Sequence, residues 1–138
     1  MNWFLWACLS AFFAGLTAIL AKIGVKEVDS NLATAIRTVV ILVFAWSVAL
    51  VRGPVSLAAV STRSWVFLIL SGLATGASWL CYFRALQLGE ASKVAPVDKL
   101  SVVVAMVLAA LILHEHLTWQ AWVGGGLIVC GSLILAWS

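Results

Sequence analysis

The chain has 138 residues, of which 64% are hydrophobic and only 9% are charged, and its formal net charge is +3. A soluble domain is about half apolar and about a quarter charged, so this chain has too little polar surface to cover a globule in water. Soluble enzymes, disordered chains and secreted disulfide scaffolds fit this composition poorly, and a lipid bilayer is the solvent that it favours. The eight lysines and arginines are scattered without a basic stripe, so no nucleic-acid partner is expected.

Five apolar segments follow one another along the chain, each long enough to cross the hydrocarbon core, which takes about twenty helical residues. The segments are continuous rather than alternating, which favours helices over barrel strands. We therefore predict an all-α integral membrane protein in which residues 1–138 form a single transmembrane domain. Its five transmembrane helices are expected over residues 3–23, 32–51, 65–88, 94–113 and 119–137.

The connectors between these segments are short and carry the polar and helix-breaking residues. Ser30 or Asn31 is expected to cap the second helix, and residues 52–54, Arg-Gly-Pro, to end it. Residues 55–63 form the longest connector. Links this short make neighbouring helices antiparallel.

Tryptophans support these boundaries. Aromatic side chains gather where headgroups meet hydrocarbon, and six of the eight tryptophans fall near predicted helix ends. They are Trp3, Trp6, Trp65, Trp119, Trp122 and Trp137.

Small residues mark positions where helices can approach closely. Gly72 and Gly76 form a G-x-x-x-G in the third segment, Gly15 lies in the first, and Gly124 and Gly131 lie in the glycine-rich last segment. In lipid, close backbone approach supplies much of the energy of helix association. We expect packing at these glycines, either within one subunit or between the subunits of a dimer.

Loop charges set the orientation of a membrane protein, and here they are nearly balanced. The loops on the N-terminal side carry Arg52 and Arg63, and those on the opposite side carry Lys22, Lys26 and Lys93. A near-balanced chain can insert in both directions. The sequence is therefore compatible with dual topology and an antiparallel homodimer.

Four charged residues lie inside the predicted spans at similar depth: Arg37, Arg84, Asp98 and Lys99. A charge near the bilayer centre costs at least about 2.5 kcal/mol, so such groups face the protein interior or pair with one another. Asp98 is the one acid of this layer and is the expected partner of Arg37 or Arg84. Two interpretations stay open: a substrate or coupling-ion site, or a structural ion pair with Lys99 and Arg84 reaching for the headgroups.

Three further residues bear on this layer. Pro96 is expected to loosen the start of the fourth helix and free a backbone carbonyl, which is tolerated at this depth only beside protein or a water cavity. Trp79 and Tyr82 lie near Arg84, where their rings could line a pocket for a cationic or amphipathic solute. Packing is the more common role of such rings.

Other chemistry is not indicated. The three cysteines are odd in number, match no zinc spacing, and are expected to be small buried hydrophobic residues. A solvated loop explains His114-Glu115-His116 better than a metal site does. Neither a nucleophile–base set, a P-loop nor a dinucleotide motif is present, so we expect no enzyme, no cofactor and no metal.

Residues 84–96 read Arg-Ala-Leu-Gln-Leu-Gly-Glu-Ala-Ser-Lys-Val-Ala-Pro and join the third predicted span to the fourth. This stretch resembles the end of the third and the start of the fourth helix in EamA domains of the drug/metabolite transporter superfamily. Residues 111–119 resemble its Leu-Gly-Glu-Arg-Leu turn, with His114 and His116 in place of the usual glycine and arginine. The glycine-rich stretch 124–131 follows in the expected place.

This resemblance implies a function. Typical members carry two such five-helix repeats in inverted orientation and alternate access to a site between them. This chain is similar to one repeat, which implies a half-size secondary transporter of small metabolites or amphipathic compounds in the cell inner membrane. Its expected partners are the lipid bilayer, a small-molecule substrate, and a second copy or a sibling repeat. The alternative is a non-transporting accessory or scaffold subunit.

Overall fold

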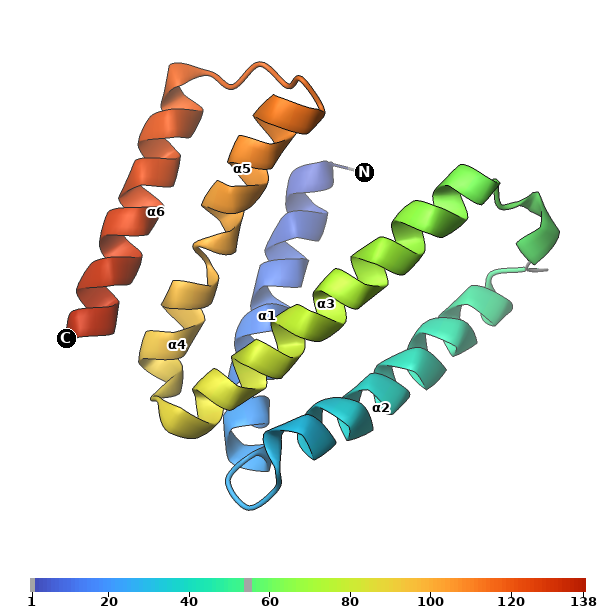
Figure 1. The fold of residues 1–138 in the computed structure, drawn as a ribbon, viewed down its shortest axis with the longest axis horizontal. Helices are drawn as coiled ribbons and strands as arrows, with labels where there is room; N and C mark the ends of the chain where they lie inside the picture. Colours follow the sequence, from blue (N-terminus) through green and yellow to red (C-terminus); the bar gives the residue numbers. More distant parts are fainter. Residues whose placement is uncertain (1, 54–55) are drawn as a thin grey trace. The chain divides into compact units, whose positions relative to one another are not determined.

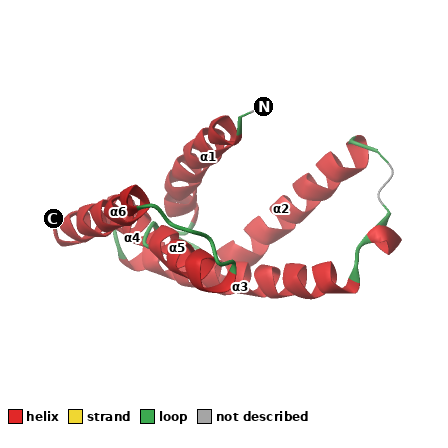
Figure 2. Ribbon diagram, turned by 90° about the horizontal axis from the view of Figure 1, so that it is seen from above, coloured by secondary structure: helices red, strands yellow, loops and turns green. Residues whose placement is uncertain are grey.

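The computed structural model describes residues 2–53 and 56–138, and every regular element in these residues is a helix (Figure 1, Figure 2). Five stretches in them are long and apolar enough to cross a membrane, and the fourth consists of two helices in succession. The elements in chain order are α1 Trp3–Gly24, α2 Ser30–Val51, the 3-10 turn η1 Leu57–Ala59, α3 Thr62–Leu88, α4 Ala91–Asp98, α5 Ser101–Ile112 and α6 Trp119–Trp137. The predicted all-α multi-pass membrane fold is confirmed.

The predicted span boundaries agree with the observed ones to within three residues. Pro54 and Val55, which the sequence places in the longest connector, lie outside the described residues. The agreement follows from bilayer thickness, which fixes the length of an apolar run that crosses it.

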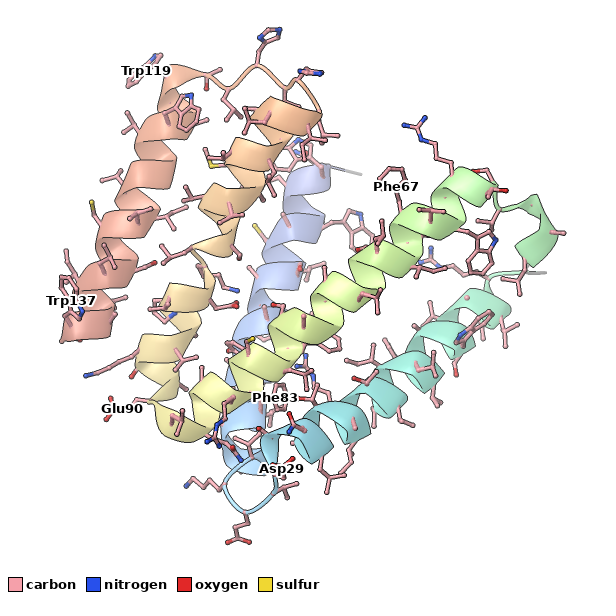
Figure 3. The ribbon with its side chains drawn as sticks, in the orientation of Figure 1. Asp29, Phe67, Phe83, Glu90, Trp119 and Trp137 are labelled. Carbon is pink, nitrogen blue, oxygen red and sulfur yellow. The ribbon has the colours of Figure 1, made fainter. Side chains whose placement is uncertain are left out.

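The spans bury very little of their own surface. Between 0% and 11% of each apolar window is buried within the chain. The buried hydrophobic side chains are Ala18, Val25, Phe83 and Leu86. Exposed apolar surface on this scale requires a lipid or protein covering. Trp119 and Trp137 lie at opposite ends of α6 and are 70% and 84% exposed, as an aromatic belt requires (Figure 3).

The chain divides into two compact units, and each is described by itself. Residues 23–87, the hairpin unit, contain α2 and α3. Residues 2–22 and 88–138, the terminal unit, contain most of α1 together with α4, α5 and α6. The expectation of a single domain stays a prediction.

In the hairpin unit, α2 and α3 run antiparallel, meeting near the start of α2 and diverging toward η1 (Figure 1, Figure 2). Asp29 caps α2, because its Oδ1 accepts hydrogen bonds from the backbone N–H groups of Asn31 at 2.9 Å and Leu32 at 3.1 Å. A carboxylate also suits the positive end of the helix. The prediction of Ser30 or Asn31 as the cap was therefore wrong: both lie within α2, and Ser30 is buried.

In the terminal unit, α4 and α5 both pack against α6. The fourth span breaks at Lys99 and Leu100, where backbone N–H groups bond three residues back, Lys99 to Pro96 and Leu100 to Val97, both at 3.0 Å. Pro96 has no N–H group, and its ring crowds the carbonyl four residues earlier. The expected loosening at the start of the span is not observed, because α4 runs without interruption from Ala91 through Pro96 to Asp98, and the span breaks only after it.

The connector from α5 to α6 turns at His114, which has φ +55°. The resembled turn has glycine here, the residue for which this backbone region carries no steric penalty, whereas another residue loses about 1 kcal/mol. The Glu115 N–H donates to the Ala109 carbonyl at 3.2 Å, which closes the end of α5. Thr118 then caps α6 through its side chain, which accepts from the Ala121 N–H at 3.4 Å.

Close packing at a glycine is found at Gly125, in the glycine-rich last segment. A Cβ built on Gly125 would lie 3.3 Å from Cε of Met106 on α5 and 3.9 Å from Cγ2 of Val103. A Cβ built on each of the five predicted packing glycines would meet no heavy atom within 4 Å. Packing at those five positions stays a prediction. Their surfaces are not covered by other described residues of this chain, so the predicted packing would be against another subunit or another protein. The five are Gly15, Gly72, Gly76, Gly124 and Gly131.

Candidate functional site

The central feature of the hairpin unit is an intramembrane arginine held against aromatic rings. Cζ of Arg37 on α2 lies 4.6 Å from the ring centroid of Trp79 and 5.4 Å from that of Phe83, both on α3. Trp79 and Phe83 are four residues apart and therefore share one helix face. Phe83 is buried, while Arg37 and Trp79 are half-buried. The two rings supply attraction to a cation in a segment where a bare charge is costly.

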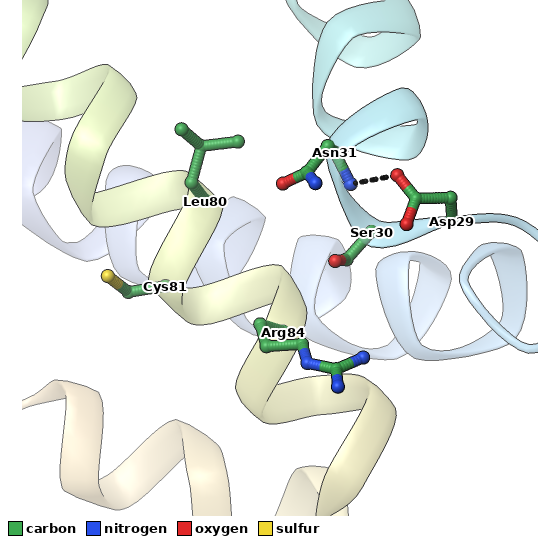
Figure 4. Close-up of a pocket in the computed structure, with 6 residues that line it drawn as sticks. All are labelled: Asp29, Ser30, Asn31, Leu80, Cys81 and Arg84. Carbon is green, nitrogen blue, oxygen red and sulfur yellow. Dashed lines mark hydrogen bonds between the residues drawn. The ribbon is translucent and has the colours of Figure 1, made fainter.

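An open hollow of about 520 Å³ adjoins this cluster, at the point where α2 begins and α3 ends. Figure 4 shows the residues that line it, with the Asn31 N–H bonded to Asp29. Leu80 and Arg84 follow Trp79 and Phe83 by one residue each along α3, so the hollow and the ring cluster occupy adjacent faces of that helix. The lining residues are Asp29, Ser30, Asn31, Leu80, Cys81 and Arg84.

Arg84 is engaged by a glutamine rather than by an acid. Its Nη1 donates to Oε1 of Gln87 at 3.1 Å. Nε2 of Gln87 donates in turn to the backbone carbonyls of Val28 at 2.7 Å and Val25 at 3.3 Å. This network ties the connector between α1 and α2 to the end of α3. It keeps the polar groups at this edge of the hairpin unit satisfied.

Tyr82 lies on the same stretch of α3. It is half-buried, and its ring centroid is 6.4 Å from that of Phe83 in an edge-on arrangement. The structure thus brings together two of the predicted site residues, Arg37 and Trp79, and places Tyr82 and Arg84 on neighbouring positions of α3.

The other two predicted site residues belong to the terminal unit. Asp98 ends α4 and Lys99 follows it, and their side chains form an ion pair of 3.5 Å at the break in the fourth span. Their side chains are 36% and 54% exposed, in which case such a pair adds little stability. The expected pairing of Asp98 with Arg37 or Arg84 joins residues of different units and stays a prediction.

One contact in the terminal unit fixes the backbone beside this ion pair. Oγ of Ser132 on α6 donates to the Pro96 carbonyl at 2.8 Å, and Ser132 is 5% exposed. The carbonyl also accepts from the Lys99 N–H at 3.0 Å. The serine therefore ties α6 to the broken span two residues before Asp98.

Sequence reasoning missed three of these residues, Phe83, Gln87 and Ser132. The signal for Phe83 was its spacing of four from Trp79, since both rings face the antiparallel neighbour. Gln87 and Ser132 gave no comparable signal, because each bonds to a backbone carbonyl of another segment.

Metal ligands do not add to the site, and of the three cysteines Cys81 lines the hollow. Within residues 2–53 and 56–138, no three His, Cys, Asp or Glu side chains gather as a metal site would require. The cysteines were expected to be buried, but Cys8, Cys81 and Cys130 are free thiols on exposed faces of their helices. The apolar runs that contain them present most of their surface outward, to lipid.

Comparison with known proteins gives matches along the whole chain. The model of the EamA-like transporter family matches residues 1–137. The chain is 52% identical over 136 residues to the "Uncharacterized transporter in cobO 3'region" of Sinorhizobium sp, covering 98% of this chain and 96% of that protein.

A second relative matches over a shorter stretch. The chain is 30% identical over 69 residues to the "Probable 4-amino-4-deoxy-L-arabinose-phosphoundecaprenol flippase subunit ArnE" of Aeromonas salmonicida (strain A449). That stretch covers 50% of this chain and 60% of the relative. No solved structure shows a significant match.

Proposed function

We propose that this chain, which belongs to the EamA-like transporter family, is one half of a secondary transporter for small metabolites or amphipathic compounds. The observation that carries the proposal is the match of a transporter family to residues 1–137, over which the structure has five potential membrane spans. The relative named a transporter aligns with this chain over nearly its whole length, since the alignment covers 96% of that protein. Membership also favours a transporter over an enzyme.

The transport unit in this proposal is a dimer in the inner membrane, with the antiparallel arrangement favoured. One five-helix repeat does not enclose a path with two openings, whereas two inverted repeats do so by alternating access. The balanced loop charges support insertion in both directions. The glycines at positions 72 and 76 are open and available for contact with a second subunit.

Asp98 is the proposed coupling group. It is an acid at the break of a spanning helix, and its described ion pair with Lys99 is partly exposed. Protonation of Asp98 changes which side of the path is open. No nucleotide motif is present, so an ion or solute gradient drives the cycle.

Reconstituted protein tests the proposal. We expect proteoliposomes containing the chain to acidify internally, reported by trapped pyranine, when a solute from a panel of amino acids, sugar phosphates and organic cations is added outside under a proton gradient. Asp98→Asn should abolish this solute-dependent signal while chemical cross-linking still detects the dimer. Glu90→Gln is the matched control, because it neutralises an acid at the other end of α4 that takes no part in the ion pair.

Two results would count against this assignment. Undiminished solute-dependent proton flux with Asp98→Asn would remove Asp98 from the mechanism. Flux for no solute in the panel, measured with the unaltered dimer, would favour the second candidate function, an accessory subunit of a larger transporter. The name of the ArnE relative, a flippase subunit, supports that alternative.

Topology reporters at the C-terminus separate the assemblies. Signal on both sides of the membrane supports dual insertion and an antiparallel homodimer. Signal on one side supports a heterodimer with a sibling repeat of opposite orientation, or a parallel assembly.

A further inference from the structure

The charge of Arg37 is held in place but is not neutralised within its unit. Arg37 lies seven residues into α2, about 10 Å along the helix axis from Ser30. Within residues 2–53 and 56–138 it forms no ion pair with an acid: the rings of Trp79 and Phe83 lie against it, and the phenol of Tyr82 interacts with it electrostatically. A guanidinium stays protonated, so an anion must approach it if the charge is to be stable in a span.

The ring contacts leave the N–H donors of the Arg37 guanidinium available for a ligand. Trp79 and Phe83 attract the cation at its central carbon, over the ring faces. The N–H donors of Arg point outward in the guanidinium plane, where they match both oxygens of a carboxylate or phosphate. Stacking therefore fixes the side chain without using its donors, which is how an oxyanion site is pre-organised.

The same contacts argue against a cationic solute. The sequence allowed Trp79 and Tyr82 to line a cation pocket, but the face of Trp79 is taken by a cation of the protein itself. Phe83, the other ring, is only 3% exposed. A second cation here would be repelled by Arg37.

The neighbouring hollow has room for the rest of such a ligand. Its volume is about 520 Å³, and it contributes a second cation, Arg84, together with the polar side chains of Ser30 and Asn31. The carboxylate of Asp29, whose Oδ1 caps α2, keeps its negative charge and offsets one of the two arginine charges, so Arg37, Arg84 and Asp29 together leave one net positive charge.

We propose that Arg37, held by Trp79 and Phe83, binds the carboxylate or phosphate group of the transported compound, which makes the substrate an anionic amphipathic molecule. The inference rests on the proposed function and adds the substrate class.

A pair of ring-matched probes tests this directly. The full chain is placed in phosphatidylcholine nanodiscs and titrated calorimetrically with 1-naphthyl phosphate and with 1-naphthylmethylammonium. We expect the phosphate ester to bind at least about tenfold more tightly than the ammonium compound, the factor of one charge-assisted hydrogen bond. Arg37→Gln should lose at least about tenfold of the ester affinity.

Two further variants keep the test decisive. Arg37→Lys retains the charge and lacks the planar fork, so it should also weaken ester binding, even if Arg37→Gln fails to fold. Arg63→Gln is the matched control, because Arg63 also lies over a ring of the hairpin unit, 5.9 Å from Phe67, and should leave the ester affinity unchanged. Circular dichroism establishes that each variant is folded.

Competition with an anionic lipid distinguishes a lipid headgroup from a soluble anion as the source of the oxyanion. If added phosphatidylglycerol competes with the ester, the group bound is a lipid headgroup phosphate; if it does not, the group belongs to a soluble anion. Either result supports an oxyanion at Arg37. Equal affinity for the two probes, binding of neither probe to the unaltered protein, or full ester affinity in folded Arg37→Gln and Arg37→Lys would overturn the inference.

Binding in nanodiscs does not require transport, so the two proposals fail separately. Ester binding that depends on Arg37, together with no solute flux in proteoliposomes, keeps the oxyanion site and refutes transport by this chain. Solute flux without Arg37-dependent ester binding keeps transport by this chain and refutes the oxyanion site.

Discussion

Gly125 on α6 offers a quantitative test of how the terminal unit is packed. A Cβ at this position would lie 3.3 Å from Cε and 3.4 Å from Sδ of Met106. The end of a methionine side chain is flexible and can move by a few tenths of an ångström, so Gly125→Ala should be nearly neutral. Gly125→Val adds two further methyl groups toward α5, and such overpacking destabilises by about 1–3 kcal/mol.

Gly126 is the matched control, since a Cβ there meets no heavy atom within 4 Å. Gly126→Ala and Gly126→Val change helix propensity as the Gly125 variants do, but they create no contact with Met106. The difference between the two pairs therefore isolates the effect of that contact. Unfolding in mixed micelles with increasing sodium dodecyl sulfate, followed by circular dichroism, measures the difference. Met106→Ala should restore most of the stability lost in Gly125→Val, because the two sites are in contact. Equal unfolding midpoints for Gly125→Val and Gly126→Val would refute this packing of α6 on α5.

Three other contacts give further predictions, two of them in the same unfolding assay and one by amide hydrogen exchange. Ser132→Ala removes the hydrogen bond to the Pro96 carbonyl and should destabilise by about 0.6 kcal/mol, the average for interhelical hydrogen bonds in membranes; a gain in stability would contradict the contact. Asp29→Ala removes the cap of α2 and should lower stability by about 1 kcal/mol, with Asp29→Asn near neutral; equal losses in the two variants would argue for a charge effect instead. Gln87→Leu deprives the Val28 carbonyl of its donor, so amide hydrogen exchange of residues 25–29 should become faster, and unchanged protection would show that this bond does not hold the connector.

The sequence was sufficient for the span boundaries because a single physical constraint, the thickness of the hydrocarbon layer, fixes them. Residues 119–137 were predicted as a span and form α6 over the same bounds. Helix ends are less constrained, since Asp29, Ser30 and Asn31 are all good caps and only backbone geometry selects Asp29.

The candidate site was predictable in part. Arg37 stood out because a charge inside an apolar run is costly, and Trp79 because it lies away from the interface. That the two touch depends on the register of α2 against α3, which composition does not encode. The same holds for Ser132 and Pro96, which are 36 residues apart in the chain.

The break at Lys99 and Leu100 also affects how the protein meets bilayers of different thickness. The fourth span has 22 residues, about 33 Å at 1.5 Å each, slightly more than the roughly 30 Å of hydrocarbon. A rigid rod adapts to a thinner membrane only by tilting as a whole. A helix with a break can tilt one segment and leave the other upright, so residues 101–112 can absorb the mismatch while residues 91–98, held by the Ser132 hydrogen bond, stay packed against α6.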